Sequence, residues 1–280
     1  MKEKMSFDDK LSMILDLIYY FEEEYNTNFV KDNLSLNVSF LVSEDKLKVR
    51  NEIFNEMIEL FGYDGMPEIL DDEEYFKLEP FNVNFEIEFD KQELWTASKD
   101  FFHNFKLVNS RSYYKGIYKF SNGIYSAPSK EDAMKYANAV KKDNLYFERD
   151  INLKQDIFNQ LTYTIPFKMP YAKVIKDTDL QYIISSIFYD GRVVNKDNHK
   201  EKQLLNFVKT LYNDELKFKL AFLFENDLAK LAIILGYDAV FITKDYEFYF
   251  QVLNRSKMIF STPNYVKSEY EMIFRETNFK

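Results

Sequence analysis

The side chains of this chain that could do chemistry are hydroxyls, phenols, carboxylates and amines. The sequence holds no cysteine and only two histidines, His103 and His199. Without cysteine there is no thiolate nucleophile, no disulfide and no cysteine-ligated zinc, and two histidines cannot form a histidine-rich metal site. A serine hydrolase needs a histidine base, and neither histidine has a recognisable setting for that role. Carboxylate pairs are abundant, but nothing in their spacing supports a glycosidase. We therefore expect no metal.

The usual phosphate-binding loops cannot be built from this sequence. Its glycines are Gly62, Gly65, Gly116, Gly123, Gly191 and Gly236. Neither a Walker loop nor a dinucleotide-binding G-x-G-x-x-G motif fits that spacing. A bound nucleotide would have to be held by contacts other than the glycine-rich loops of P-loop or Rossmann proteins.

One segment, residues 113–128, combines phenols, a hydroxyl and a turn signal. Asn122 and Gly123 form a strong hairpin-turn pair, and Tyr125 and Ser126 follow in the next short apolar run. From the residues alone, the segment predicts a strand, a tight turn and a second strand. The second strand would carry a phenol and a hydroxyl side by side in sequence.

The elements after this segment also follow simple signals. Ser129 and Asp132 are spaced as a capping box at the start of a helix that contains Tyr136. Near the C-terminal end, an apolar helix over 228–235 stops at Gly236. Two short strands follow, and the second ends in a polar corner, Asn254-Arg255-Ser256.

Taken in order, these segments resemble an ADP-ribosyltransferase-like domain of the bacteriophage and mobile-element type. The resemblance covers roughly Glu93 to Phe260 and lies in the order and spacing of several short motifs. The motifs are Asn122-Gly123-Ile124-Tyr125-Ser126-Ala127, Ala133-Met134-Lys135-Tyr136-Ala137, Phe167-Lys168-Met169-Pro170-Tyr171-Ala172-Lys173-Val174-Ile175, Gly236-Tyr237-Asp238-Ala239 and Leu253-Asn254-Arg255-Ser256.

The resemblance implies that NAD is a substrate and assigns roles to several residues. The turn at Asn122 and Gly123 and the following strand would form one wall of the nicotinamide pocket. Ser126 would orient NAD, and Tyr125 or Tyr136 would stack on nicotinamide.

The family's first-strand arginine has two possible counterparts in this chain. The first is Thr96, in Leu94-Trp95-Thr96-Ala97. The second is Lys115, which would lie near phosphate as a point charge without the bidentate fork of arginine.

The family's catalytic glutamate, which stabilises the cationic ribose as nicotinamide leaves, corresponds to Glu247 as the only nearby acid. Strand alternation puts Glu247 on the same face as Gln251. A rigid count back from Asn254 places the family position nearer Phe248 or Tyr249. A slip or bulge in the strand would move Glu247 there. The alternative is that Glu247 is a solvated turn residue.

Two functions are compatible with these assignments. The first is NAD-dependent mono-ADP-ribosyl transfer to a macromolecule, a glycosyltransferase reaction with a protein as the expected target. The second is a catalytically inactive binding or structural protein, for example a phage virion or cargo component. The expected location is accordingly the host cytoplasm or the virion.

Periodicity predicts an α+β fold in two parts. Residues 1–90 would form an N-terminal α/β extension, and residues 91–280 an ADP-ribosyltransferase-like split β-sheet domain. In the first part we predict helices from Phe7 to Tyr25 and from Glu44 to Phe61, strands over 34–40 and 83–89, and a loop over 71–74.

In the second part, strands are predicted over 161–165 and 172–175. Asp177 is predicted to cap a helix that runs to Phe188. One long helix is predicted from Lys200 to Phe224.

Composition excludes some partners. The net charge is −9, and acidic runs such as Glu22-Glu23-Glu24 would repel a phosphate backbone, so broad nucleic-acid binding is not expected. No apolar run is long enough to span a bilayer, and the N-terminus lacks the apolar region of a signal peptide. We expect a soluble protein without membrane association.

Overall fold

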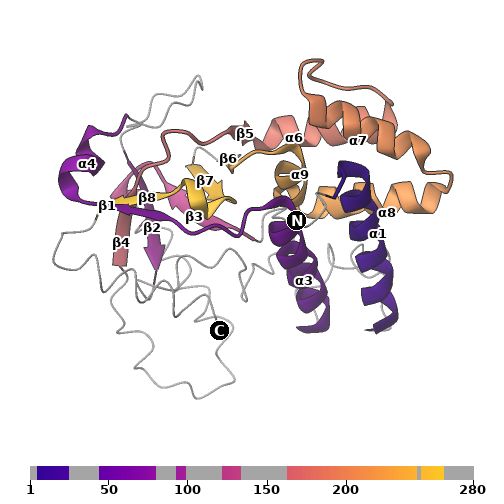
Figure 1. Cartoon of the computed structure of the whole chain (residues 1–280), viewed down its shortest axis with the longest axis horizontal. Helices are drawn as coiled ribbons and strands as arrows, with labels where there is room; N and C mark the ends of the chain where they lie inside the picture. Colours follow the sequence, from indigo (N-terminus) through magenta and orange to yellow (C-terminus); the bar gives the residue numbers. More distant parts are fainter. Residues whose placement is uncertain are drawn as a thin grey trace. The chain divides into compact units, whose positions relative to one another are not determined.

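The fold is known from a computed structural model that describes residues 5–24, 44–79, 93–98, 122–133, 163–244 and 247–261 (Figure 1). The class is α+β, as predicted, with strands paired both parallel and antiparallel. The chain forms two compact units, each assembled from three segments. The helical unit comprises residues 1–63, 108–123 and 175–240, and the sheet unit comprises 64–107, 124–174 and 241–280. The predicted boundary near residue 90 lies outside the described residues and stays a prediction.

The helical unit is built around one wholly buried helix. Its described helices are α1 (Phe7–Glu24), α3 (Glu44–Phe61), α6 (Asp177–Ile184), α7 (His199–Thr210), α8 (Asp214–Asn226) and α9 (Leu228–Leu235). Every residue of α9 is buried, and α3, α6, α7 and α8 all pack against it (Figure 1). The almost continuous apolar sequence of α9 suits this position. Gly236 ends the helix in the left-handed conformation with φ +82°.

The first two predicted helices are present as α1 and α3. The predicted bounds of α3 are confirmed, and α1 ends one residue earlier than expected. The Ser6 hydroxyl accepts a hydrogen bond from the Asp9 N–H at 3.1 Å and so caps the start of α1. The apolar stripe of α1 is buried, as its spacing predicts, and consists of Leu11, Ile14, Leu15, Ile18 and Phe21.

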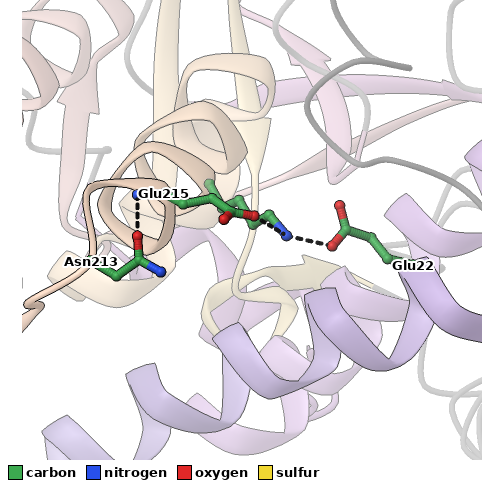
Figure 2. Close-up of polar contacts among 4 residues, drawn as sticks. Glu22, Asn213 and Glu215 are labelled. Atoms are coloured by element: carbon green, nitrogen blue, oxygen red, sulfur yellow. Dashed lines mark hydrogen bonds and ion pairs between the residues drawn. The ribbon is translucent and has the colours of Figure 1, made fainter.

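A buried ion pair joins α1 to α8. The Lys219 ammonium lies 2.6 Å from a Glu22 carboxylate oxygen and 3.2 Å from one of Glu215, and it sits over the Tyr19 ring. Figure 2 shows Glu22 approaching from α1 and Glu215 from α8. Burial lowers the pKa of Lys219, but the hydrogen bonds that its ammonium donates to the two carboxylates outweigh this effect, so the pKa is raised overall.

The prediction of one long helix from Lys200 to Phe224 is wrong. The helix is interrupted at residues 211–213, between α7 and α8. The physical reason is a new helix start: the Asn213 side-chain oxygen accepts a hydrogen bond from the Glu215 N–H at 2.8 Å, which Figure 2 also shows. Such a cap competes with continuation of the preceding helix.

The predicted helix from Asp177 to Phe188 is present but differs in detail. Asp177 is the first residue of α6 rather than its cap, because the cap position is occupied by Lys176. After Ile184 the chain continues as a π-helical turn, η5 (Ser185–Tyr189). A turn of this kind is often found at functional sites.

The sheet unit contains most of the central sheet. Its strands are β2 (Leu94–Ser98), β3 (Ile124–Ala127), β4 (Tyr163–Phe167), β5 (Val174–Lys176), β6 (Ala239–Lys244) and β7 (Glu247–Val252), in the order β4-β2-β3-β7-β6-β5. Within β5 and β6 the chain passes from one unit to the other. A second, two-stranded sheet pairs β1 (Glu68–Leu70) with β8 (Ile259–Ser261) in parallel.

Three further predictions need correction, and two cannot be compared. The strands expected over 161–165 and 172–175 are present one to two residues later, as β4 and β5. The loop expected over 71–74 is instead the start of helix α4 (Asp72–Lys77). Asp71 caps it by accepting from the Glu74 N–H, and acids favour the first turn through the helix dipole. The strands predicted over 34–40 and 83–89 lie outside the described residues.

Candidate functional site

Three neighbouring strands place two of the predicted site residues, Thr96 and Ser126, side by side. In the register, Thr96 of β2 pairs with Ser126 of β3, and Ser126 pairs with Phe250 of β7. Paired residues of adjacent strands project from the same face of a sheet, so these three side chains form one row. The Thr96 and Ser126 side chains are nearly inaccessible, at 2% and 4% exposure.

Both hydroxyls of this row donate to the backbone of the next strand. Thr96 Oγ1 donates to the Tyr125 carbonyl at 2.9 Å, and Ser126 Oγ donates to the Phe250 carbonyl at 3.3 Å. Among the described residues, no carboxylate contacts the Ser126 hydroxyl. The two side chains therefore link β2, β3 and β7 by bonds added to the strand pairing.

The face that carries Ser126 is part of the apolar core. The Phe250 ring lies 4.9 Å from the Phe241 ring, centroid to centroid. Neighbouring positions of the same face are also buried and apolar, namely Leu94, Ile124, Phe167 and Val252. A hydroxyl in this setting is suited to holding strands together, because burial without a partner would be costly.

The opposite face of the same strands has a different character. Trp95 pairs with Ala127, and Tyr125 pairs with Gln251. Both rings are half-buried, whereas Gln251 is fully buried. The Lys130 ammonium lies 5.8 Å from the centre of the Trp95 ring, within cation–π range. This face combines aromatic rings, an amide and a cation.

Of the hairpin predicted over 113–128, the structure describes the second strand, β3, and the turn residues before it, while the first strand lies outside the described residues. Asn122 is fully buried, and Gly123 has φ +110°, which a side chain would disfavour. Ser129 caps the following helix by accepting from the Asp132 N–H at 3.1 Å. Lys115 and Tyr136 lie outside the described residues.

Glu247 is the first residue of β7, and its side chain is not among those described. Along the strand it precedes Phe250, the residue that pairs with Ser126, by three positions. At about 3.3 Å per residue, the Glu247 backbone lies about 10 Å from that pair. The structure thus puts Ser126 beside Thr96 and Phe250, with Tyr125 on the other face.

Sequence reasoning overlooked Trp95, Lys130 and Gln251 as possible site residues. Alternation along 94–98 and 247–252 separates each strand's two faces, but it does not say which strands are neighbours. The register places Gln251 opposite Tyr125 and Trp95 on the same face, and Lys130 lies over the Trp95 ring.

The polar corner after β7 supports the fold. The Asn254 side chain accepts from the Ser256 N–H at 3.2 Å and caps the short 3-10 helix η6 (Arg255–Lys257). Arg255 donates to the Gly65 and Asp64 carbonyls, both at 2.9 Å. Burial lowers the pKa of Arg255. These two hydrogen bonds attach the backbone of residues 64–65 to the polar corner.

The described residues contain no group of histidine, aspartate or glutamate side chains that could hold a metal ion. Within the same residues, no helix is long and apolar enough to cross a membrane.

Comparison with protein-family models, curated proteins and solved structures found no match to this chain.

Proposed function

We propose that this chain is a catalytically inactive binding or structural protein with a sheet of the ADP-ribosyltransferase type. The proposal of ancestry rests on the motifs of 122–137 and 236–256 and is consistent with their strands, β3 and β7, being neighbours in one sheet. As a non-catalytic protein it would act on a macromolecular partner, for example as a virion or cargo component of a phage.

The assignment of an inactive protein rests on the hydrogen bonds that the Thr96 and Ser126 hydroxyls make within the sheet. By the resemblance, Thr96 is one of the two candidate counterparts of the family's first-strand arginine, the other being Lys115, and Ser126 corresponds to its NAD-orienting hydroxyl. Both hydroxyls donate to backbone carbonyls inside the sheet, and both are buried. A group already bonded within the core is poorly placed to meet a substrate.

The chemistry of ADP-ribosyl transfer sharpens this point. As nicotinamide leaves, positive charge develops on the ribose and must be met by a preorganised carboxylate in contact with it. The Ser126 face instead presents Phe250 and other apolar side chains. A cation would be desolvated there without compensation.

A second candidate function is active NAD-dependent mono-ADP-ribosyl transfer, and the opposite sheet face favours it. Trp95 and Tyr125 are half-exposed there, and the Lys130 ammonium lies over the Trp95 ring. Rings and a cation suit a nicotinamide nucleotide. In that case Tyr125 or Tyr136 would stack on nicotinamide, Lys115 would lie near phosphate, Glu247 would be the electrostatic residue, and Ser126 would not touch NAD.

Thermal unfolding in increasing NAD separates the two candidates. A ligand that binds only the native state must raise the midpoint Tm. The inactive protein gives an unchanged Tm, or a raised Tm without release of nicotinamide. The enzyme gives a raised Tm with release of nicotinamide. In that case Tyr125→Ala abolishes the rise in Tm and the release of nicotinamide, whereas Ser126→Ala leaves both effects in place.

A further inference from the structure

The helical unit carries exposed tyrosine and arginine side chains where α6, η5 and α8 meet. Tyr182 of α6 is 52% exposed and Tyr189 of η5 is 60% exposed. Arg192, which follows η5, is exposed as well. We call the following set the tyrosine–arginine patch: Tyr182, Tyr189, Asp190, Arg192, Phe218 and Glu225.

Hydrogen bonds hold these exposed side chains in place. Arg192 donates to an Asp190 carboxylate oxygen at 3.2 Å and to the Tyr182 hydroxyl at 3.4 Å. The Tyr189 hydroxyl donates to Glu225 of α8 at 2.8 Å. Partial burial and this bond raise the pKa of Tyr189 to about 12, so it remains a donor at neutral pH. Side chains ordered before binding lose less entropy when a partner arrives.

An exposed apolar ring extends the patch along α8. Phe218 precedes Glu225 by seven residues, or two helical turns, so both lie on the same side of the helix about 10 Å apart. The Phe218 ring contacts that of buried Phe222, with 6.2 Å between centroids. Phe218 itself is exposed.

The composition of the patch suits a protein interface. Tyrosine, phenylalanine and arginine are enriched in the centres of protein interfaces. The patch also bears both charge signs, since Arg192 is bonded to the Tyr182 hydroxyl and the Glu225 carboxylate to the Tyr189 hydroxyl. A twofold interface brings one surface against itself and therefore requires a self-complementary patch.

We propose that two copies of this chain associate through the tyrosine–arginine patch about a twofold axis, with Arg192 of each copy facing Glu225 of the other. The tyrosine rings and Phe218 are buried in this interface. Replacing the exposed Arg192–Asp190 ion pair by an Arg192–Glu225 pair between the two copies costs little free energy, since such surface pairs contribute little to stability. This self-association is independent of the function of the sheet.

Sedimentation equilibrium of the full chain over a hundredfold range of concentration tests the proposal. The wild-type chain is expected to change from monomer to dimer. Tyr189→Ala should raise the dimer dissociation constant about a hundredfold or more, because a central tyrosine contributes strongly and a twofold interface loses it twice. Tyr20→Ala is the matched control, since Tyr20 of α1 is 57% exposed and lies outside the patch.

A charge exchange provides the sharper test. Arg192→Glu alone and Glu225→Arg alone should each prevent self-association, because like charges meet twice in either homodimer. An equimolar mixture of the two variants should form a heterodimer, in which both pairs are again of opposite sign. Formation of this heterodimer would also show that each variant is folded.

Three results would overturn the proposal. The first is a wild-type chain that stays monomeric at every concentration. The second is an equal loss of association in Tyr20→Ala and Tyr189→Ala. The third is a mixture of the two charge variants that associates no better than either alone.

Discussion

At the scale of single residues, Thr96 and Ser126 illustrate how the same side chain supports chemistry in one setting and structure in another. The resemblance inferred from the sequence would give both a role in an enzyme site, yet each hydroxyl is bonded to a backbone carbonyl of the adjacent strand. Burial decides between the two roles, because a buried hydroxyl must satisfy its donor locally.

Removing either hydroxyl should therefore cost stability. We expect Thr96→Val and Ser126→Ala each to lower the free energy of unfolding by about 1 kcal/mol, the typical net value of one buried hydrogen bond. Urea unfolding followed by circular dichroism measures this. Ser185→Ala, at an exposed serine, is the control and should stay within about 0.5 kcal/mol of wild type. Unchanged stability in both core variants would contradict the assigned role.

A second prediction at this scale concerns Gly65. A Cβ at this position would come within 2.7 Å of the Ser256 Cβ, closer than real contacts allow. We expect Gly65→Ala to destabilise the protein by about 1–3 kcal/mol, as overpacking does. In the double variant with Ser256→Gly, most of that loss should be recovered in the same urea assay. No recovery would mean that the clash is not its cause.

The sequence alone indicated the candidate site only in part. Tyr125 and Ser126 were found from the motif, and Gly123 from its turn signal. Their positions on opposite sheet faces follow from strand alternation. The neighbours Trp95, Lys130 and Gln251 depend on pairings between residues far apart in the chain, which no local pattern encodes.

At the scale of secondary-structure elements, helices with strong periodicity were predicted well and those with competing signals were not. The apolar spacing in α1 and α3 indicated both that these segments are helical and where each helix begins and ends. The break before α8 was missed although Asn213 is a good capping residue, because the apolar pattern continues across it. The start of α4 was missed because acidic residues were assigned to a loop.

The contact between α1 and α8 leads to a prediction about two carboxylates. Glu22 is largely buried and Glu215 is exposed, while both bind Lys219. Glu22→Gln should lower the free energy of unfolding by about 1–3 kcal/mol, and Glu215→Gln by less than about 1 kcal/mol. Thermal or urea unfolding checks the order. Equal effects would contradict the buried position of the Glu22 pair.

The same pair predicts a dependence on pH. Because the pKa of Lys219 is raised in the folded state, its stabilising effect is fully present below the ordinary lysine value of about 10.4. The effect is lost as the pH rises through the raised folded-state pKa. The stability difference between wild type and Glu22→Gln should therefore be constant from pH 7 to pH 9 and shrink at higher pH. A difference that grows with alkaline pH would refute this assignment.

At the scale of the whole molecule, each unit draws on segments that are distant in sequence. The helical unit takes α1 and α3 from the first 63 residues and α6 to α9 from 175–240. Sequence patterns suggested a boundary near residue 90 because the motifs begin there. Local patterns predict elements, but which elements share a core is determined by contacts of long range.

A truncation tests the division at residue 90. A fragment of residues 91–280 lacks α1 and α3, whose apolar side chains such as Ile14 and Phe54 are fully buried. We expect this fragment to lose cooperative thermal unfolding and to bind an apolar dye. Adding residues 1–90 as a separate chain should restore part of the transition. A fragment that unfolds as cooperatively as the full chain would instead support an independent domain.

The most direct test of the central claim is release of nicotinamide from NAD by the purified full chain, alone and with cell-extract proteins as acceptors. With the Thr96 and Ser126 hydroxyls bonded inside the sheet, we predict a rate equal to that of the heat-denatured protein. Turnover above that background, lost in a folded Glu247→Gln variant, would contradict the account and establish the enzyme.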